Sequence, residues 1–136
     1  MAISEGPTIE SWVAGTTFSS TDVYMFVTAD SEGHVVMAAD GSTNLLPVGV
    51  LYGYTQTTTT ESEAVPVATW GVVKVKAAAS TLSAGDVIAC SSLGMIGALS
   101  SDNVACGIIK YGSSGAANRI MSVQLWKFGQ KTVNPA

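Results

Sequence analysis

The chain has 136 residues, of which 12% are charged and 47% hydrophobic, and its net charge is −4. This length suits one compact domain, and the few, scattered basic residues disfavour a nucleic-acid surface, which needs clustered Lys and Arg. The charged fraction is about half the usual value. We therefore expect a surface covered by small polar residues, or one partly buried against other subunits.

The charges are divided along the chain. Residues 1–63 hold eight acidic side chains and no Lys or Arg, whereas all six basic side chains lie from residue 64 onward beside two acidic ones. Two interpretations stay open. The acidic and basic segments could pair between subunits, or the two halves could intertwine in one domain so that the asymmetry disappears in space.

The first 20 residues are predicted to form an extended N-terminal arm. Its apolar residues follow neither a strand period nor a helix period, because Ser, Thr, Gly and Glu separate them. The arm residues expected to contact a partner are Ile3, Ile9, Trp12, Val13 and Phe18. One interpretation has Trp12 packing back on its own domain, and the other is an arm that orders on a partner by strand addition.

The beginning of the chain does not read as a targeting segment. Residues 1–12 have neither the basic nor the apolar region of a signal peptide, and no stretch approaches the roughly 18 apolar residues of a membrane-spanning helix. We therefore expect synthesis in the cytoplasm and no membrane partner. Cys90 and Cys106 each lie in an apolar run and are expected to be buried, reduced side chains.

Two β-hairpins are predicted from apolar runs that flank a glycine turn. Val23–Ala29 and His34–Ala38 surround the loop Asp30–Gly33, whose glycine can adopt a positive φ angle. The second hairpin joins Val87–Cys90 to Met95–Ala98 through a tighter turn.

The remaining predicted elements are also strands. They are Val48–Tyr54, Ala64–Thr69, Val72–Ala77, Ala105–Tyr111 and Ile120–Phe128. Thr55–Ser62 and Gly112–Asn118 are predicted loops. Ser80–Ala84 is a helical turn at most, and residues 129–136 are a C-terminal tail. The fold class is therefore all-β, with one small barrel-like or sandwich-like domain, of the β-tulip or β-clip type, over residues 21–128.

A faint internal duplication relates residues 21–68 to residues 85–126. Each copy opens with an Asp-Val pair, turns at a glycine and begins a second apolar run. The predicted equivalences are Asp22–Val23 with Asp86–Val87, Gly33 with Gly94, Gly49–Leu51 with Gly107–Ile109, and Val65–Val67 with Val123–Leu125. The duplication predicts two interlocked β units with pseudo-twofold symmetry.

The sequence offers no constellation typical of an enzyme or a cofactor site. His34 is the only histidine, so a multi-histidine metal site is excluded, and its place after Gly33 favours a solvated turn residue. The sequence contains no P-loop, Gly-x-Ser-x-Gly or Gly-x-Gly-x-x-Gly pattern. Asp86 follows Gly85 and is interpreted as an acceptor for backbone N–H groups in a turn. We predict that the protein is not an enzyme and binds no cofactor or metal.

The segment from Val65 to Leu125 has a specific order of elements: a strand, a small-residue linker, a Leu-x-x-Gly-Asp-Val strand, a glycine turn and a Gly-Ile-Ile strand. The residues that carry this order are Trp70–Val75, Leu82–Val87, Gly94, Gly107–Ile109 and Val123–Leu125. In this order, which covers about half of the chain, the sequence resembles the capsid decoration, or head cement, proteins of tailed phages. Residues 1–63 fit that family less well.

The resemblance implies a structural protein of the virion, made in the host cytoplasm. Such proteins assemble as trimers on the outer surface of the matured head, bridge neighbouring subunits of the major capsid protein and stabilise the shell without catalysis. We expect the N-terminal arm to clamp onto the capsid. The composition agrees with this role, because many weak contacts repeated over a lattice hold by avidity.

Two other functional classes stay open. The first is a receptor-binding or glycan-binding module of a virion fibre, although buried core aromatics explain the same residues. Its stacking platforms would be Trp70, Trp126, Tyr52 or Tyr54. The second is a β-clip accessory domain of an enzyme such as a sugar-acid dehydratase, which the missing histidines and metal ligands disfavour.

Overall fold

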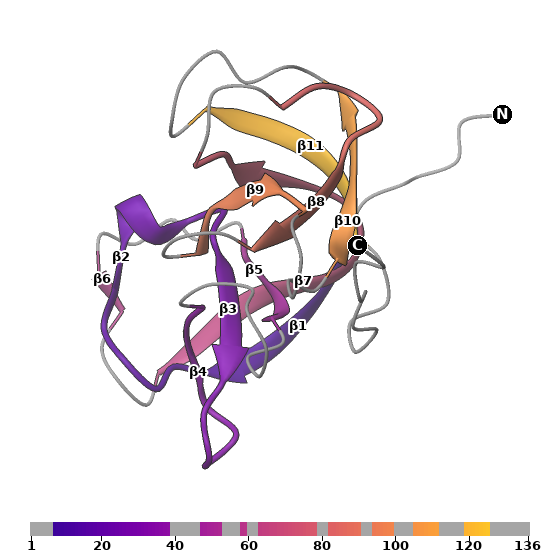
Figure 1. The fold of residues 1–136 in the computed structure, drawn as a ribbon. Coiled ribbons are helices and arrows are strands. Elements are labelled where there is room, and N and C mark those ends of the chain that lie inside the picture. The colour runs from indigo at the N-terminus through magenta and orange to yellow at the C-terminus, as the bar shows by residue number, and fades with distance from the viewer. Residues whose placement is uncertain are drawn as a thin grey trace, which may run out of the picture.

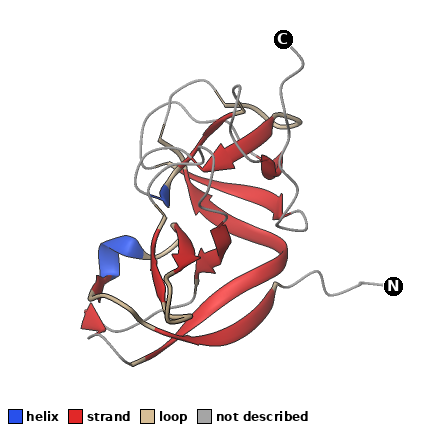
Figure 2. Ribbon diagram, turned by 60° about the horizontal axis from the view of Figure 1, so that its bottom comes forward, coloured by secondary structure: helices blue, strands red, loops and turns tan. Residues whose placement is uncertain are grey.

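The fold was determined as a computed structural model, shown in Figures 1 and 2. It describes residues 7–38, 47–52, 58–59, 63–78, 82–90, 94–99, 105–111 and 119–125. These residues form β-strands joined by turns, with only short 3-10 turns as helical structure, and the predicted all-β fold class is confirmed. No helix in this part of the chain is long and apolar enough to cross a membrane.

The strands are named in the order in which they follow one another along the chain. They are β1 (Thr8–Val13), β2 (Phe18–Ser19), the 3-10 turn η1 (Ser20–Asp22), β3 (Phe26–Ala29), β4 (Val35–Met37), β5 (Pro47–Leu51), β6 (Thr58–Thr59), β7 (Ala64–Lys76), β8 (Val87–Cys90), β9 (Ile96–Ala98), β10 (Ala105–Tyr111) and β11 (Ile120–Leu125). β2 and β6 pair with each other in a separate ribbon. All other strands belong to one antiparallel sheet that curls into a half-barrel (Figure 1).

Across this sheet, two sets of equivalent strands follow one another in opposite directions. The order of strands is β4-β3-β5-β7-β11-β10-β8-β9, with β1 added beside β7. The first part of β7 pairs with β1 and β5, and residues 71–76 of β7 pair with β11. We call the part with β1, β3, β4 and β5 the first sheet, and the part with β8 to β11 the second sheet. β7 therefore belongs to both sheets.

β7 runs without a break through two strands that the sequence predicts separately, Ala64–Thr69 and Val72–Ala77. The join is Gly71, whose φ angle is 99°. Glycine adopts such an angle at little cost because it lacks a Cβ atom. The strand can therefore bend from one sheet into the other while its pairing continues on both sides of the glycine.

Both predicted hairpins are confirmed. β3 pairs with β4 and β8 pairs with β9, and the turn glycines Gly33 and Gly94 have φ angles of 81° and 78°. Other predicted segments lie outside the described residues, so their predictions stay as they are. They are Gly112–Asn118, the end of the strand Ile120–Phe128, and the tail 129–136. The segment predicted as the loop Thr55–Ser62 contains the two-residue strand β6, which pairs with β2. Of Ser80–Ala84, residues 82–84 are described and are not helical.

The pairing of the strands repeats between the two predicted copies. β3 pairs with β4 in the same register as β8 pairs with β9, so Gly33 and Gly94 are equivalent, as predicted. Gly49 and Gly107 are also equivalent. A Cβ atom would lie 2.4 Å from a carbonyl oxygen of the next strand at Gly49 and 2.3 Å from one at Gly107. This close approach explains why both copies have glycine there.

Two of the predicted equivalences are wrong by a few residues. Asp86 O accepts a 2.9 Å bond from a β10 N–H, and Met25 O accepts the corresponding 2.9 Å bond from a β5 N–H. Met25, and not Asp22, is therefore the counterpart of Asp86. The pairing of β5 with β7 and of β10 with β11 likewise matches Val67 with Val123, two residues from the predicted register.

The first copy of the duplication begins at β1, within the segment predicted as an arm. The N–H of Ala14 donates to Glu63 O at 2.8 Å, and the N–H of Ala77 donates to Arg119 O at 2.8 Å. β1 pairs with the first half of β7, and the second half of β7 pairs with β11. The two pairings have the same register. β1 is therefore the counterpart of the second half of β7.

We call residues 8–70 the first unit and residues 71–125 the second unit. Two hydrophobic clusters of buried side chains form the core, and the smaller one lies within the first unit. The larger cluster joins the inner face of the second unit to Phe26, Val50 and Ala68 of the first unit. The back of the first sheet therefore packs into the curl of the second.

Candidate interaction surface

A row of side chains across the back of the first sheet is buried. Phe26 pairs with Val50, Val50 pairs with Ala68, and all three have an exposed fraction of 0%. Ile9 on β1 pairs with Ala68 and continues the row, but it is 49% exposed. This row is the face with which the first unit packs into the second.

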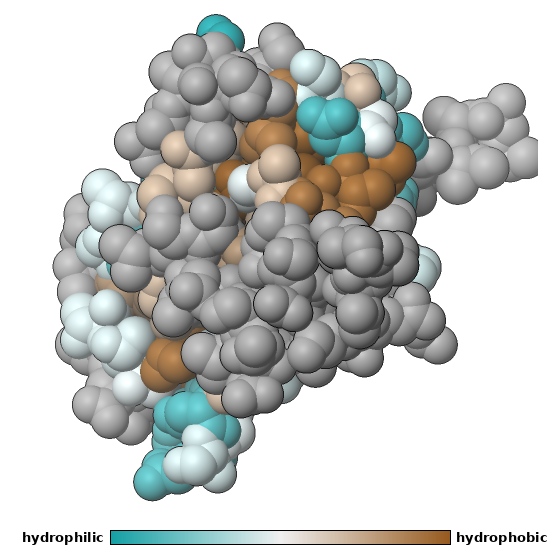
Figure 3. All heavy atoms as spheres, in the orientation of Figure 1, coloured by the Kyte–Doolittle hydropathy of each residue, from teal (hydrophilic) through white to brown (hydrophobic). Residues whose placement is uncertain are grey.

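The equivalent row of the second unit is open to solvent. It consists of Val87, Ile108, Gln124 and Val72, which pair in that order across β8, β10, β11 and β7. All four side chains are half-buried, and three of them are apolar. Figure 3 shows apolar surface gathered over β8 and β10. We call these four residues the open row, because a contiguous apolar face in contact with water typically marks an interaction site.

One margin of the second sheet carries exposed apolar side chains beside basic ones. Tyr111 is 65% exposed and Ile120 is 45% exposed. Tyr111 pairs with Ser122, which lies on the same face of β11 as Ile120 because side chains alternate along a strand. Lys110 and Arg119 precede the two apolar residues in the chain and are exposed. We call Lys110, Tyr111, Arg119 and Ile120 the basic margin.

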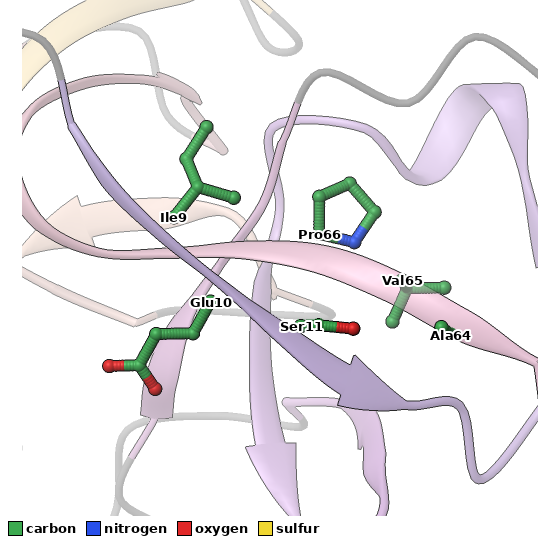
Figure 4. Close-up of a pocket in the computed structure, with 6 residues that line it drawn as sticks. All are labelled: Ile9, Glu10, Ser11, Ala64, Val65 and Pro66. Atoms are coloured by element: carbon green, nitrogen blue, oxygen red, sulfur yellow. The ribbon is translucent and has the colours of Figure 1, made fainter.

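A shallow groove lies where β1 crosses β7 in the first unit. Its volume is about 360 Å³, and it is lined by Ile9, Glu10, Ser11, Ala64, Val65 and Pro66. In Figure 4, Ile9 and Pro66 project to one side of the strands and Glu10 to the other. Val13 lies on the same face of β1 as Ile9, and the exposed Glu63 directly precedes the lining of β7. We call this site the acidic groove.

The five residues predicted to contact a partner are placed differently. Ile3 lies outside the described residues. Ile9 and Val13 are exposed on β1, whereas Trp12 packs against the smaller cluster and Phe18 belongs to that cluster with 1% of its surface exposed. β1 is thus a paired strand, and Trp12 packs on its own domain. A capsid contact stays a prediction for the five residues, of which Ile9 and Val13 are the two that the structure shows exposed.

Neither the open row nor the basic margin was predicted from the sequence, although a signal is present. Ile120 shares one face of β11 with Ser122 and Gln124, so an apolar residue stands on the polar face of an alternating strand. Val72 likewise shares a face of β7 with Lys74. Ile120 and Val72 are each the apolar residue on an otherwise polar face, and Ile120 is exposed and Val72 half-buried.

The polar residues singled out in the sequence have structural roles in turns. Asp30 Oδ1 accepts backbone N–H bonds from Glu32 at 2.9 Å and from His34 at 3.0 Å. Asp86 accepts the N–H of Ser83 at 2.9 Å, as predicted for a turn acceptor. In the described part of the chain, no three His, Cys, Asp or Glu side chains are grouped so that they could hold a metal ion.

Cys90 and Cys106 are buried thiols, as predicted. Burial raises the pKa of Cys106 to about 12, and a hydrogen bond with the backbone of Cys90 opposes this shift only in part. Cys106 is therefore protonated at neutral pH. Because the thiolate is the nucleophilic form, the Cys106 side chain is a packing residue.

Tyr24 has the only positive φ angle, 70°, among the non-glycine residues that the structure describes. Its counterpart is Gly85, with a φ angle of 93°. The N–H of Tyr24 donates to Leu51 O at 2.7 Å, and the N–H of Gly85 donates to Ile109 O at 2.8 Å. The Tyr24 ring meets the Tyr52 ring edge-on, with centroids 5.5 Å apart and an interplanar angle of 67°.

The aromatic residues considered as glycan platforms do not gather in the described structure. Trp70 is 50% exposed, and Tyr52 packs against the larger cluster. Tyr54 and Trp126 lie outside the described residues. No family model matches the sequence, and no curated protein matches it. The candidate interaction surfaces of the described residues are the open row, the basic margin and the acidic groove.

Proposed function

We propose that the protein is a structural component of a phage virion that decorates the outer surface of the mature capsid. It bridges neighbouring subunits of the major capsid protein and needs no catalysis. The observation that carries this proposal is the open row, an apolar face on paired strands whose counterpart in the first unit is a packing face. The resemblance of Val65–Leu125 to head cement proteins supports the same role, and this segment contains the whole open row.

The size of the open row suits a contact that is repeated over a lattice. Its four side chains lie on neighbouring strands about 4.8 Å apart and so span about 15 Å. Burying roughly 100 Å² of apolar surface contributes about 2.5 kcal/mol, which alone gives weak binding. A trimer that engages several capsid subunits at once gains from the high effective concentration of its remaining contacts. Weak individual contacts then suffice.

Co-sedimentation with phage heads that lack the protein tests this proposal. Purified protein is mixed with expanded and with unexpanded heads, and the bound amount is measured against the free concentration. We expect saturable binding to expanded heads alone, because the mature lattice presents the repeated site. Binding to neither form would contradict the proposal and favour the fibre or accessory-domain alternatives.

A further inference from the structure

The two units carry opposite charges at equivalent positions. Glu63 and Arg119 are counterparts, because their carbonyl oxygens accept the same 2.8 Å bonds from the equivalent residues Ala14 and Ala77. The described first unit has five acidic side chains and no basic one. The basic side chains of the described second unit are Lys74, Lys76, Lys110 and Arg119, against Asp86 alone.

The acidic groove and the basic margin are also complementary in polarity. The groove is a hollow with apolar lining from Ile9 and Pro66. Glu10 also lines it, from the other side of the strands (Figure 4), and the exposed Glu63 directly precedes the lining residues of β7 in the chain. The margin instead projects two exposed apolar side chains and flanks them with basic ones. Apolar surface would therefore meet apolar surface, with opposite charges around it.

One chain cannot make this contact with itself, because the groove and the margin lie at opposite ends of β7. The groove is lined by residues at the start of β7, whereas Ile120 of the margin pairs with Lys76 at its end. β7 has 13 residues, which at about 3.3 Å per residue separate its two ends by up to roughly 40 Å. The partner that fits each surface is a second copy of the chain.

We propose that the basic margin of one copy inserts into the acidic groove of a second copy in a head-to-tail contact. Tyr111 and Ile120 bury their apolar surface against Ile9 and Pro66 of the neighbour. Arg119 of one copy faces Glu63 of the next, at the rim of this contact. The contact forms in solution and does not depend on a capsid, so it extends beyond the proposed function.

The distribution of charge selects this contact over a like-with-like contact. Two acidic grooves or two basic margins would bring like charges together, which disfavours association. A contact between two different surfaces is heterologous, and its repetition closes a ring when the rotation between copies allows. The expected trimer is one such ring.

Charge reversal at the two counterpart residues tests the proposal. Sedimentation velocity at low salt measures the association of the full chain and of its variants. Arg119→Glu and Glu63→Arg are each expected to weaken association about tenfold or more, which corresponds to about 1.4 kcal/mol. The double variant restores the pair and is expected to associate within about threefold of the natural chain. Glu32→Arg, the same charge change on the exposed hairpin turn, is the matched control and should have no effect.

Three outcomes of this experiment would overturn the proposal. The first is a natural chain that stays monomeric at its highest soluble concentration. The second is a single reversal that leaves association unchanged in a folded variant, with circular dichroism as the check. The third is a double variant as weak as the single ones.

Disulfide trapping locates the contact independently of its strength. Ile9→Cys chains are oxidised alone, and mixed with Ile120→Cys or Tyr111→Cys chains. Cross-linking requires Cβ atoms about 3.8 Å apart, and the native cysteines are buried. We expect a cross-linked dimer in a mixture and none from Ile9→Cys alone. A dimer from Ile9→Cys alone, or no dimer in either mixture, would overturn the head-to-tail contact.

Discussion

Tyr24 holds a backbone conformation that its counterpart, Gly85, adopts at little cost. A left-handed conformation costs a residue with a Cβ atom about 1–2 kcal/mol, and surrounding contacts must hold a bulky residue there. The edge-on contact with Tyr52 is one such contact. The two units thus make the same backbone hydrogen bond at this position. Gly85 adopts the positive φ angle because it has no side chain, whereas Tyr24 needs side-chain contacts such as the one with Tyr52.

Alanine substitutions at two equivalent glycines should separate backbone strain from crowding. A Cβ atom at Gly33 would meet nothing within 4 Å, whereas at Gly94 it would lie 2.6 Å from Met37 Sδ and 2.8 Å from Phe26 O. Gly33→Ala is expected to lower the free energy of unfolding by about 1 kcal/mol through its φ angle, and Gly94→Ala by roughly 3 kcal/mol. Urea denaturation measures both losses. Equal losses would contradict the packing described around Gly94.

Cys106 should make the fold less stable at alkaline pH. Burial raises its pKa from 9.0 to about 12 in the folded state, so the thiol of the unfolded chain ionises first. Across that interval the unfolded state binds fewer protons, and the free energy of unfolding falls as pH rises. Below it, both states are protonated and the thiol has no effect. Urea titrations at several pH values should show a flatter decline for Cys106→Ala, and an identical decline would refute this origin.

At the scale of elements, β1 and β2 belong to the folded domain. Phe18 at the start of β2 is 1% exposed, whereas Val13 at the end of β1 is 40% exposed. Phe18→Ala is expected to cost about 4 kcal/mol, and Val13→Ala no more than about 0.5 kcal/mol. Chemical denaturation compares the two variants. A detachable arm would instead make both substitutions harmless.

Short-range patterns in the sequence identify most of the strands. The hairpins β3–β4 and β8–β9 follow from apolar runs around a glycine, and β10 has its predicted bounds, Ala105–Tyr111. β1 was not predicted as a strand because its alternation is incomplete. Glu10 occupies the position at which the second unit has the buried Val73. An edge strand tolerates such a residue because that position remains exposed.

The register of the duplication could not be predicted, because equivalent positions share few residue types. Gly85, Asp86 and Val87 correspond to Tyr24, Met25 and Phe26, which have no residue in common with them. Asp22–Val23 has the same residue types as Asp86–Val87, but the structural counterpart of Asp86–Val87 is Met25–Phe26. The candidate surfaces were missed for a related reason, because they depend on pairing between strands that are distant in the sequence.

At the scale of the whole molecule, the separation of charge predicts association that depends on salt. The screening length falls from about 30 Å at 0.01 M to about 3 Å at 1 M salt. The head-to-tail contact is expected to weaken about tenfold over this range, because its charged rim is exposed and screened. Sedimentation velocity at increasing NaCl measures the change. An oligomer mass that does not respond to salt would show that charge pairing does not hold the assembly.

Binding to the capsid should depend on the open row. Ile108→Asp places a charge in the middle of the row and is expected to weaken co-sedimentation with expanded heads at least tenfold. The variant should keep the oligomer mass of the natural chain, and Glu32→Lys is its control. Full head binding by a folded Ile108→Asp variant would remove the open row as the capsid contact.

β7 is both the last strand of the first unit and the first strand of the second. A cut at Gly71 would take β11 from its partner in the second sheet, and it would expose the row of Phe26, Val50 and Ala68 that packs into the second unit. Neither copy can therefore be excised as an independent domain. The chain is expected to unfold in a single cooperative transition, unlike tandem repeats whose members melt one at a time.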